Sequence, residues 1–160
     1  MTETLLADLN NPNHAEDFMT VLRNYAKDPM GGDDPLPDNV IESLVPALKK
    51  LDNNRIVLCY IDDKIAGIAN CFFGFSSFKA KPLINIHDFA IMPEFRGQGL
   101  SKNLLDKVEE IAKESDCCKI TLEVLENNHK AKHVYQVFGF EGYELNPEMG
   151  KAVFWQKTLS

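Results

Sequence analysis

The fold is decided by a stretch that begins Ile84-Asn85-Ile86-His87-Asp88-Phe89-Ala90-Ile91-Met92 and continues Pro93-Glu94-Phe95-Arg96-Gly97-Gln98-Gly99-Leu100-Ser101. Its first half is apolar and rich in β-branched and aromatic residues, which is typical of a buried strand. Apolar residues then recur at helical spacing, at Leu100, Leu104, Leu105, Val108, Ile111 and Ala112. A helix is therefore predicted to begin near Gly99 or Ser101, after a glycine-containing loop.

The loop between this strand and this helix is suited to an anion. Backbone N–H groups and the positive end of the helix dipole converge at a helix N-terminus. Gly97 and Gly99 lack a Cβ and let a ligand approach the backbone, and the guanidinium of Arg96 suits a phosphate. The loop is not a P-loop, because no Gly-Lys-Ser/Thr ends it. It is not the dinucleotide fingerprint either, because Lys102 stands where that motif has Gly or Ala.

The loop resembles the pyrophosphate loop of the GCN5-related N-acetyltransferases, the GNAT family, whose pattern is Arg/Gln-x-x-Gly-x-Gly/Ala before a helix. Here the pattern stands as Arg96-Gly97-Gln98-Gly99-Leu100-Ser101. Ser101 departs from the usual glycine or alanine, and we expect the loop to tolerate it because serine is small and a good N-cap. The resemblance implies that these six residues bind the cofactor.

A second segment resembles the same family. It runs Asn128-His129-Lys130-Ala131-Lys132-His133-Val134-Tyr135-Gln136-Val137-Phe138-Gly139-Phe140. This matches the family's Asn-x-x-Ala-x-x-x-Tyr-x-x-x-Gly-Phe pattern at every fixed position. The two motifs occur in the family's order, separated by one predicted helix and one predicted strand.

The whole chain predicts one α/β domain, residues 1–160. Helices are predicted at 12–27, 40–51, 100–115 and 128–138, and strands at 3–9, 55–61, 65–73, 84–92, 118–125, 140–145 and 151–158. This order predicts a mixed sheet with helices on both faces. The resemblance implies a mostly antiparallel sheet of six or seven strands, splayed between the fourth and fifth. It also implies that the pantetheine arm of acetyl-CoA enters the splay and pairs with the fourth strand at Phe89 and Ile91.

Composition limits the other classes of function. The formal net charge of −7 argues against nucleic acid or an anionic membrane as the main partner. No run of 18 apolar residues is present, and the N-terminus lacks the basic start of a signal peptide. The cysteines show neither C-x-x-C nor metal spacing; they are Cys59, Cys71, Cys117 and Cys118. We expect reduced thiols, no metal and a cytoplasmic location, and we leave a homodimer open.

Acetyl transfer to an amine needs a deprotonated amine, a stabilised oxyanion and a protonated leaving thiolate. Backbone N–H groups near Phe89 and Ile91 can stabilise the oxyanion. By resemblance, acetyl-CoA is the co-substrate and Tyr135 is the acid that protonates the thiolate; the alternative is a core tyrosine on an apolar helix face. Asn128 is implied as a contact to the cofactor, although capping of its helix alone would also explain it.

Three residues compete for the role of base. Glu123 precedes Tyr135 by 12 residues, as the proposed base does in the ribosomal-protein alanine acetyltransferases, whose Leu-Glu-Val segment this chain shares. His87 and Asp88 are predicted to lie on opposite faces of strand 84–92. A buried aspartate needs a partner or a function, and a hydrogen bond to a loop is the alternative for Asp88, as a satisfied core imidazole is for His87. We place Glu123 ahead of the other two.

The acceptor is expected to bind between the loops 28–38 and 74–82, which line the acceptor site in the family. The first loop is acidic, with Asp28, Asp33, Asp34 and Asp38. It would attract a cationic amine, such as a polyamine, an aminoglycoside or a peptide N-terminus, or else it is only a solvated surface loop. Two other functions compete with an N-acetyltransferase: a module that binds acyl-CoA without turnover, and a nucleotide-phosphate loop of another α/β enzyme.

Overall fold

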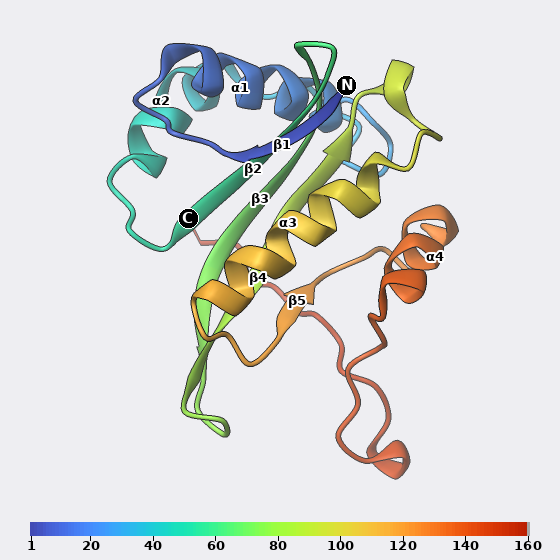
Figure 1. Ribbon diagram of the computed structural model, residues 1–160. Coiled ribbons are helices and arrows are strands. Elements are labelled where there is room, and N and C mark those ends of the chain that lie inside the picture. Colours follow the sequence, from blue (N-terminus) through green and yellow to red (C-terminus); the bar gives the residue numbers. More distant parts are fainter. Residues whose placement is uncertain (160) are drawn as a thin grey trace.

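Five strands form one mixed sheet in the computed structural model, which describes residues 1–159 (Figure 1). They are β1 (Thr2–Leu6), β2 (Asn54–Ile61), β3 (Lys64–Ser76), β4 (Lys81–Ile91) and β5 (Ile120–Leu122). The first four strands pair in chain order as antiparallel neighbours, and β5 is parallel to β4. The predicted α/β class is confirmed.

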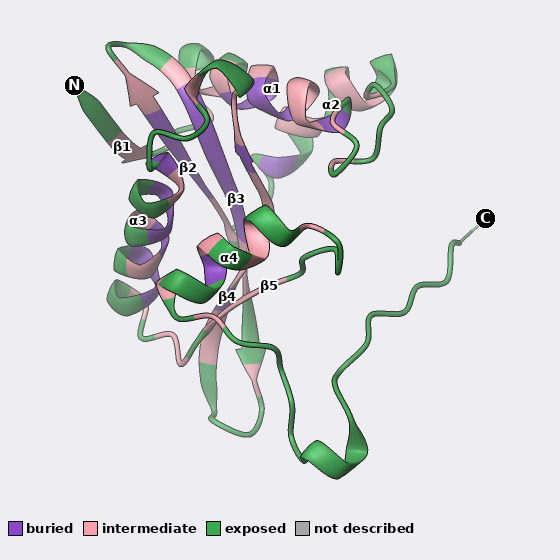
Figure 2. Ribbon diagram, turned by 90° about the vertical axis from the view of Figure 1, so that its right-hand side faces the viewer, coloured by how far each residue is buried: buried purple, intermediate pink, exposed green. Residues whose placement is uncertain are grey.

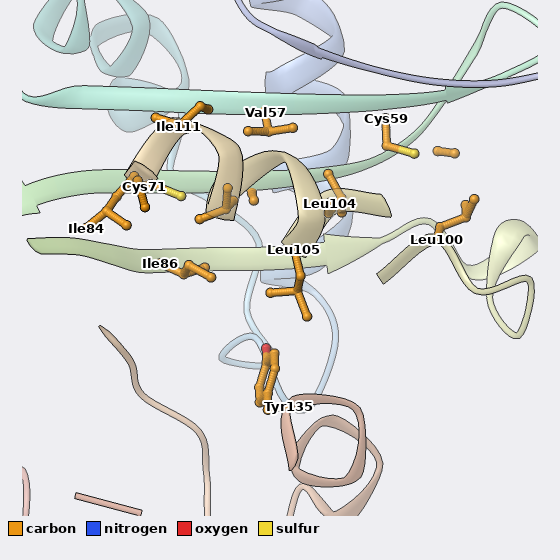
Figure 3. Close-up of a cluster of buried hydrophobic side chains, with 14 residues drawn as sticks. Val57, Cys59, Cys71, Ile84, Ile86, Leu100, Leu104, Leu105, Ile111 and Tyr135 are labelled. Carbon is orange, nitrogen blue, oxygen red and sulfur yellow. The ribbon is translucent and has the colours of Figure 1, made fainter. Parts of the chain in front are cut away.

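Helices cover both faces of this sheet (Figure 1). They are α1 (Pro12–Ala26), α2 (Asp38–Leu48), α3 (Leu100–Glu114) and α4 (His129–Phe138), with 3₁₀ turns η1 (Pro93–Phe95) and η2 (Pro147–Met149). Apolar side chains of α1 and α2 pack on one face, and those of α3 pack on the other, with Tyr135 of α4 at its margin (Figure 3). The four predicted helices therefore form, with ends close to those expected.

Strand β2 shows why its sequence is a continuous apolar run. Ile56 and Leu58 pack toward α1 and α2, whereas Val57 and Cys59 pack toward α3, and all four are buried. A strand that is covered on both faces has no position left for polar side chains. Each buried aliphatic side chain contributes about 1.5–3 kcal/mol to folding, so this central strand anchors both layers of helices.

The segment 74–82 is not the connecting loop that the sequence predicted. β3 continues to Ser76 and β4 begins at Lys81, so the segment is the tip of a long β-hairpin. Phe75 and Phe78 are exposed there. Cross-strand pairing extends beyond the buried part of both strands, which a reading of apolar runs does not detect.

The strands predicted at 140–145 and 151–158 do not form. Beyond α4, the described chain to residue 159 is irregular apart from η2, is largely exposed, and leads away from the sheet (Figure 2). The predicted strand 118–125 shortens to Ile120–Leu122. Apolar alternation makes a strand only where a partner completes the ladder, and Pro147 and Gly150 interrupt this segment. The described sheet thus has five strands, and the six or seven strands and the splay that were expected are not seen.

Candidate active site

The loop before α3 has the glycine geometry that the sequence predicted. Gly97 and Gly99 have φ values of +77° and +78°, in the left-handed region that favours glycine. A Cβ placed on either glycine would meet no atom within 4 Å, so the space beside the loop is open. Gly99 is the N-cap of α3; the expectation that Ser101 serves as a cap is wrong, because it lies inside the first turn.

The side chains of Gln98 and Leu100, on either side of Gly99, differ in their exposure to solvent. Gln98 is exposed, whereas the side chain of Leu100 is buried in the core beneath α3. Leu100 can therefore offer a ligand only its backbone. Because the first N–H groups of a helix have no partner within the helix, the N-terminus of α3 presents donors to the open side of the loop.

Arg96 joins this loop to two other parts of the molecule. Its Nε donates to the carbonyl oxygen of Ile91 at 3.2 Å, and its Nη2 lies 3.0 Å from Oδ2 of Asp28, in the loop after α1. The N–H of Met30 holds the pKa of Asp28 below its ordinary value, and Arg96 lowers it further. Asp28 is thus an ion-pair partner of the glycine loop as well as a member of the acidic loop.

Over its second half, one edge of β4 pairs with no other strand of residues 1–159. β5 pairs with β4 only at Ile84, Asn85 and Ile86. The N–H of Met92 donates to Ala66 of β3. Because N–H groups alternate in direction along a strand, those of Phe89 and Ile91 point away from β3, toward the free edge. The structure therefore gives both predicted residues the backbone orientation that pairing with a ligand requires.

The alternation of side chains predicted that His87 and Asp88 lie on opposite faces of β4. This prediction is wrong. The register shifts between Asn70–Asp88 and Cys71–Ile86, so His87 is an extra residue in a β-bulge. The His87 ring makes a T-shaped contact with Phe72, which packs on the α1–α2 face, at 5.2 Å between ring centroids. His87 is exposed, and its Nδ1 lies 3.2 Å from Oδ1 of Asn85.

Asp88 is half-buried and is held by a neighbour. The Nδ2 of Asn70 donates to its Oδ2 at 2.8 Å. The charge of Asp88 also helps to raise the pKa of Tyr25, at the end of α1, although burial is the larger cause and Asp28 contributes too. The carboxylate is therefore close enough to Tyr25 to affect the ionisation of its hydroxyl.

Tyr135 lies on α4, beside the free edge of β4. Its side chain is 8% exposed, and its ring centroid lies 5.8 Å from those of Phe89 and Phe140. In Figure 3 its hydroxyl points away from α4 toward the sheet. Burial raises the pKa of Tyr135 to about 12, with a smaller contribution from Tyr25. At neutral pH this hydroxyl keeps its proton.

The remaining predicted residues are placed as follows. Asn128 is the N-cap of α4, and its Oδ1 accepts from the N–H of Ala131 at 3.2 Å. Glu123 follows directly after β5 and is exposed.

Between residues 1 and 159, no group of three His, Cys, Asp or Glu side chains is arranged to hold a metal ion. All four cysteines are free, and burial raises the pKa of the Cys117 thiol, which disfavours a thiolate nucleophile there.

Three residues near Asp88 were missed by sequence reasoning: Tyr25, Asn54 and Asn70. A signal for Asn70 was available, since it is a single amide within the apolar run 65–73. No local signal marked Tyr25, because its spacing fits the apolar face of α1.

Comparisons with known proteins give the family of similar sequences. The family model for the acetyltransferase (GNAT) family matches residues 18–140. The chain is 32% identical over 75 residues to a thialysine N-epsilon-acetyltransferase of Bos taurus, an alignment that covers 47% of this chain and 44% of that protein. The chain spans about half the length of the curated relatives it matches.

Solved structures share the fold over almost the whole chain. A probable acetyltransferase has a TM-score of 0.81 at 19% identity and covers 99% of both chains. The aminoglycoside N-acetyltransferase AAC(6')-Iy, in complex with the bisubstrate analogue CoA-S-monomethyl-acetylneamine, has a TM-score of 0.77 at 17% identity, again over 99% of both chains. No helix described in residues 1–159 is long and apolar enough to cross a membrane.

Proposed function

The chain belongs to the GNAT family of acetyltransferases, and we propose that it moves the acetyl group of acetyl-CoA to a primary amine. The observation that carries the proposal is the free edge of β4, which leads through the turn η1 to the open glycine loop and the N-terminus of α3. An extended arm of amides suits a strand edge, and a pyrophosphate suits a helix N-terminus. Relatives named as N-acetyltransferases support the same reaction.

The chain offers distinct groups to each part of this co-substrate. The N–H groups of Phe89 and Ile91 would hold the pantetheine arm, and the backbone of residues 96–101 would hold the pyrophosphate. A side chain at Gly97 or Gly99 would fill the space that the phosphates need. Arg96 keeps N–H donors beyond its two bonds to Ile91 and Asp28. Asn128 caps α4, the helix that carries Tyr135.

Acetyl-CoA supplies the activated acetyl group as a thioester. Asp88 would take a proton from the ammonium of the acceptor, so that the neutral amine attacks directly, without an acyl-enzyme. The N–H groups on the free edge of β4 would stabilise the oxyanion. Tyr135 would give its proton to the leaving thiolate, and the surplus proton on the amide nitrogen would pass to the tyrosinate and restore the acid. The raised pKa of Tyr135 supports this role because the acid form is retained at neutral pH.

We favour Asp88 over Glu123 and His87 as the base. Asp88 is half-buried and is held by the hydrogen bond from Asn70. Glu123 is exposed after a strand of three residues, and His87 is exposed at a bulge. A general base must be held within hydrogen-bonding reach of its proton, and Asp88 is the most firmly held of the three.

The acceptor is proposed to be a cationic amine on a small molecule or a peptide. Asp88 and the acidic segment 28–38, with Asp28, Asp33, Asp34 and Asp38, are the negative charges that would attract such an amine, and Asp28 is already paired with Arg96. The names of the similar proteins include thialysine and an acetylneamine analogue, both of which carry amines. The free thiols support a cytoplasmic location.

The test combines binding with turnover. Thermal unfolding is measured with acetyl-CoA, CoA, ATP and NAD, since a ligand of the native state raises the melting temperature by mass action. Release of free thiol is then followed with polyamines, lysine analogues, aminoglycosides and peptides. Stabilisation by acetyl-CoA and CoA alone, with thiol release, supports the enzyme. Stabilisation without release from any amine would favour the binding module, and stabilisation by ATP or NAD would overturn the assignment of the loop.

A further inference from the structure

Three polar side chains form a chain of hydrogen bonds across the sheet, ending at Asp88. Nδ2 of Asn54 on β2 donates to Oδ1 of Asn70 on β3 at 2.8 Å, and Nδ2 of Asn70 donates to Oδ2 of Asp88 on β4 at 2.8 Å. Asn70 is 5% exposed and is the one polar residue that is fully buried among residues 1–159. This hydrogen-bond chain is therefore an exception in an otherwise apolar interior.

The groups at the two ends of this hydrogen-bond chain decide which atoms of Asn70 donate and which accept. Nδ2 of Asn54 also donates to the carbonyl oxygen of Cys71 at 3.0 Å, so Asn54 presents a donor to Asn70. A carboxylate only accepts hydrogen bonds. If the Asn70 amide were turned over, its oxygen would face the carboxylate of Asp88 and its NH₂ would face the NH₂ of Asn54. Asn70 thus has one satisfied orientation, in which it donates to Asp88.

Position 70 has apolar surroundings, so an apolar residue would fit there if the hydrogen-bond chain had no role. Ile68 and Phe72, two residues away on either side and on the same face of β3, pack in the apolar cluster beneath α1 and α2. A buried amide must recover the cost of leaving water through its hydrogen bonds. The bulge at His87 begins directly after the Asn70–Asp88 pair, so backbone register and side-chain bond fix the same carboxylate.

We propose that Asn70, supported by Asn54, is a positioning residue for the acetyl transfer. It holds Oδ2 of Asp88 and thereby leaves Oδ1 directed to the amine of the acceptor. This inference rests on the proposed function, and it adds two residues that do not touch the substrate but decide where the base lies. Misplacement of a catalytic group by about 1 Å can cost up to about 100-fold in rate.

The test is a double-mutant cycle with Asn70→Leu and Asp88→Asn, followed by thiol release with the best amine. Leucine resembles asparagine in size but cannot form either bond. Asn70→Leu is expected to lower kcat by about 10- to 100-fold and to leave KM for acetyl-CoA within about twofold. In the Asp88→Asn background, Asn70→Leu is expected to have little further effect, because both changes remove the same function.

Two further variants keep the test decisive. Asn54→Leu changes the half-buried end of the chain and is expected to give a smaller loss of kcat, which covers the case in which Asn70→Leu does not fold. Tyr60→Phe is the matched control: it removes the 2.7 Å bond from the Tyr60 hydroxyl to Asp17 on the same face of the sheet, outside the Asp88 chain. It is expected to keep kcat within about twofold.

The outcomes separate the two proposals. If the wild-type protein releases no thiol with any amine, the proposed function fails. If it is active and the losses from Asn70→Leu and Asp88→Asn simply add, or Asn70→Leu keeps full kcat, the positioning role alone is wrong. A readout without turnover checks the bond itself: the side-chain amide NMR signals of Asn70 should shift in Asp88→Asn and stay unchanged in Glu123→Gln.

Discussion

Strand β4 contains one carboxylate that acetyl transfer could use as a base, and strand β5 is followed directly by another, yet the two are held very differently. β4 has 11 residues, and its Asp88 is half-buried and bonded to a buried amide. β5 has three residues, and its Glu123 lies just beyond the strand end, in solvent. The two residues look alike in the sequence, since both are acidic and both adjoin an apolar run.

This difference in support, rather than the motif around either residue, is the reason that we propose Asp88 as the base. Asp88 is fixed by a residue on the next strand and by a bulge in its own strand. Glu123 has neither support. Four substitutions and one pH titration break or sharpen this comparison, from the largest expected effect to the smallest.

Gly99→Trp should abolish cofactor binding. Without the cofactor no acetyl transfer takes place, whether Asp88 or Glu123 is the base. An indole would occupy the open space beside the loop, and the φ of +78° is strained for any side chain. The expected result is no rise in melting temperature with acetyl-CoA. Gly142→Trp is the matched control, because Gly142 also has open space but lies outside the loop. An unchanged thermal shift in Gly99→Trp would show that the cofactor binds elsewhere.

Asp88→Asn should lower kcat by about 10²- to 10⁴-fold, the usual contribution of a general base. The amide preserves the shape of the side chain but cannot accept a proton at neutral pH. Binding of acetyl-CoA should persist, and thermal shift measures it in the same sample. A kcat close to that of the wild type would remove Asp88 from the reaction and return Glu123 to first place.

Tyr135→Phe should slow turnover by about 100-fold and leave the affinity for acetyl-CoA intact. The substitution removes only the hydroxyl, so the ring can keep its contacts with Phe89 and Phe140. Steady-state thiol release and thermal shift measure the two quantities separately. Tyr143→Phe, in the exposed C-terminal segment, should change neither. Normal turnover of Tyr135→Phe at every pH would refute the acid role.

The same tyrosine makes stability depend on alkaline pH. Its pKa is raised to about 12 in the fold, so the stabilisation it gives is complete below pH 10 and is lost as the pH rises toward 12. The free energy of unfolding should therefore fall by about 1–3 kcal/mol more in the wild type than in Tyr135→Phe over that range. Urea titrations followed by circular dichroism measure this, and equal slopes would contradict the burial of the hydroxyl.

Glu123→Gln should have the smallest effect, with kcat within about twofold and stability within about 0.5 kcal/mol of the wild type. An exposed side chain after a short strand has no fixed partner to lose. Assays at several pH values guard against a change of rate-limiting step. A loss as large as that of Asp88→Asn would reverse the comparison between the two strands.

Much of the fold could be predicted because it follows local patterns. The helix from Leu100 and the cap at Asn128 both follow rules of spacing and capping that hold along the chain itself. The αL turn at Asp62 and Asp63 closes the β2–β3 hairpin, as expected for a short acidic turn between apolar runs. Both motifs of the resemblance also lie on the predicted kinds of element.

What failed depended on partners distant in sequence. The bulge at His87 arises from pairing with β3, so the alternation of β4 alone gave the wrong face for this residue. The segments 140–145 and 151–158 have apolar residues suited to strands but no ladder to join in the described chain. The hydrogen bond between Asn70 and Asp88 joins residues 18 positions apart, and no periodicity within either strand reveals it.

The exposed C-terminal segment determines how this protein can be observed by fluorescence. Trp155 is the only tryptophan in the chain, and it is 84% exposed. Its emission therefore reports the solvent around the segment, and an unfolding curve recorded through it would barely register the melting of the core beneath α3. For the same reason, a blue shift of that emission would be a clean optical signal that something has covered the segment.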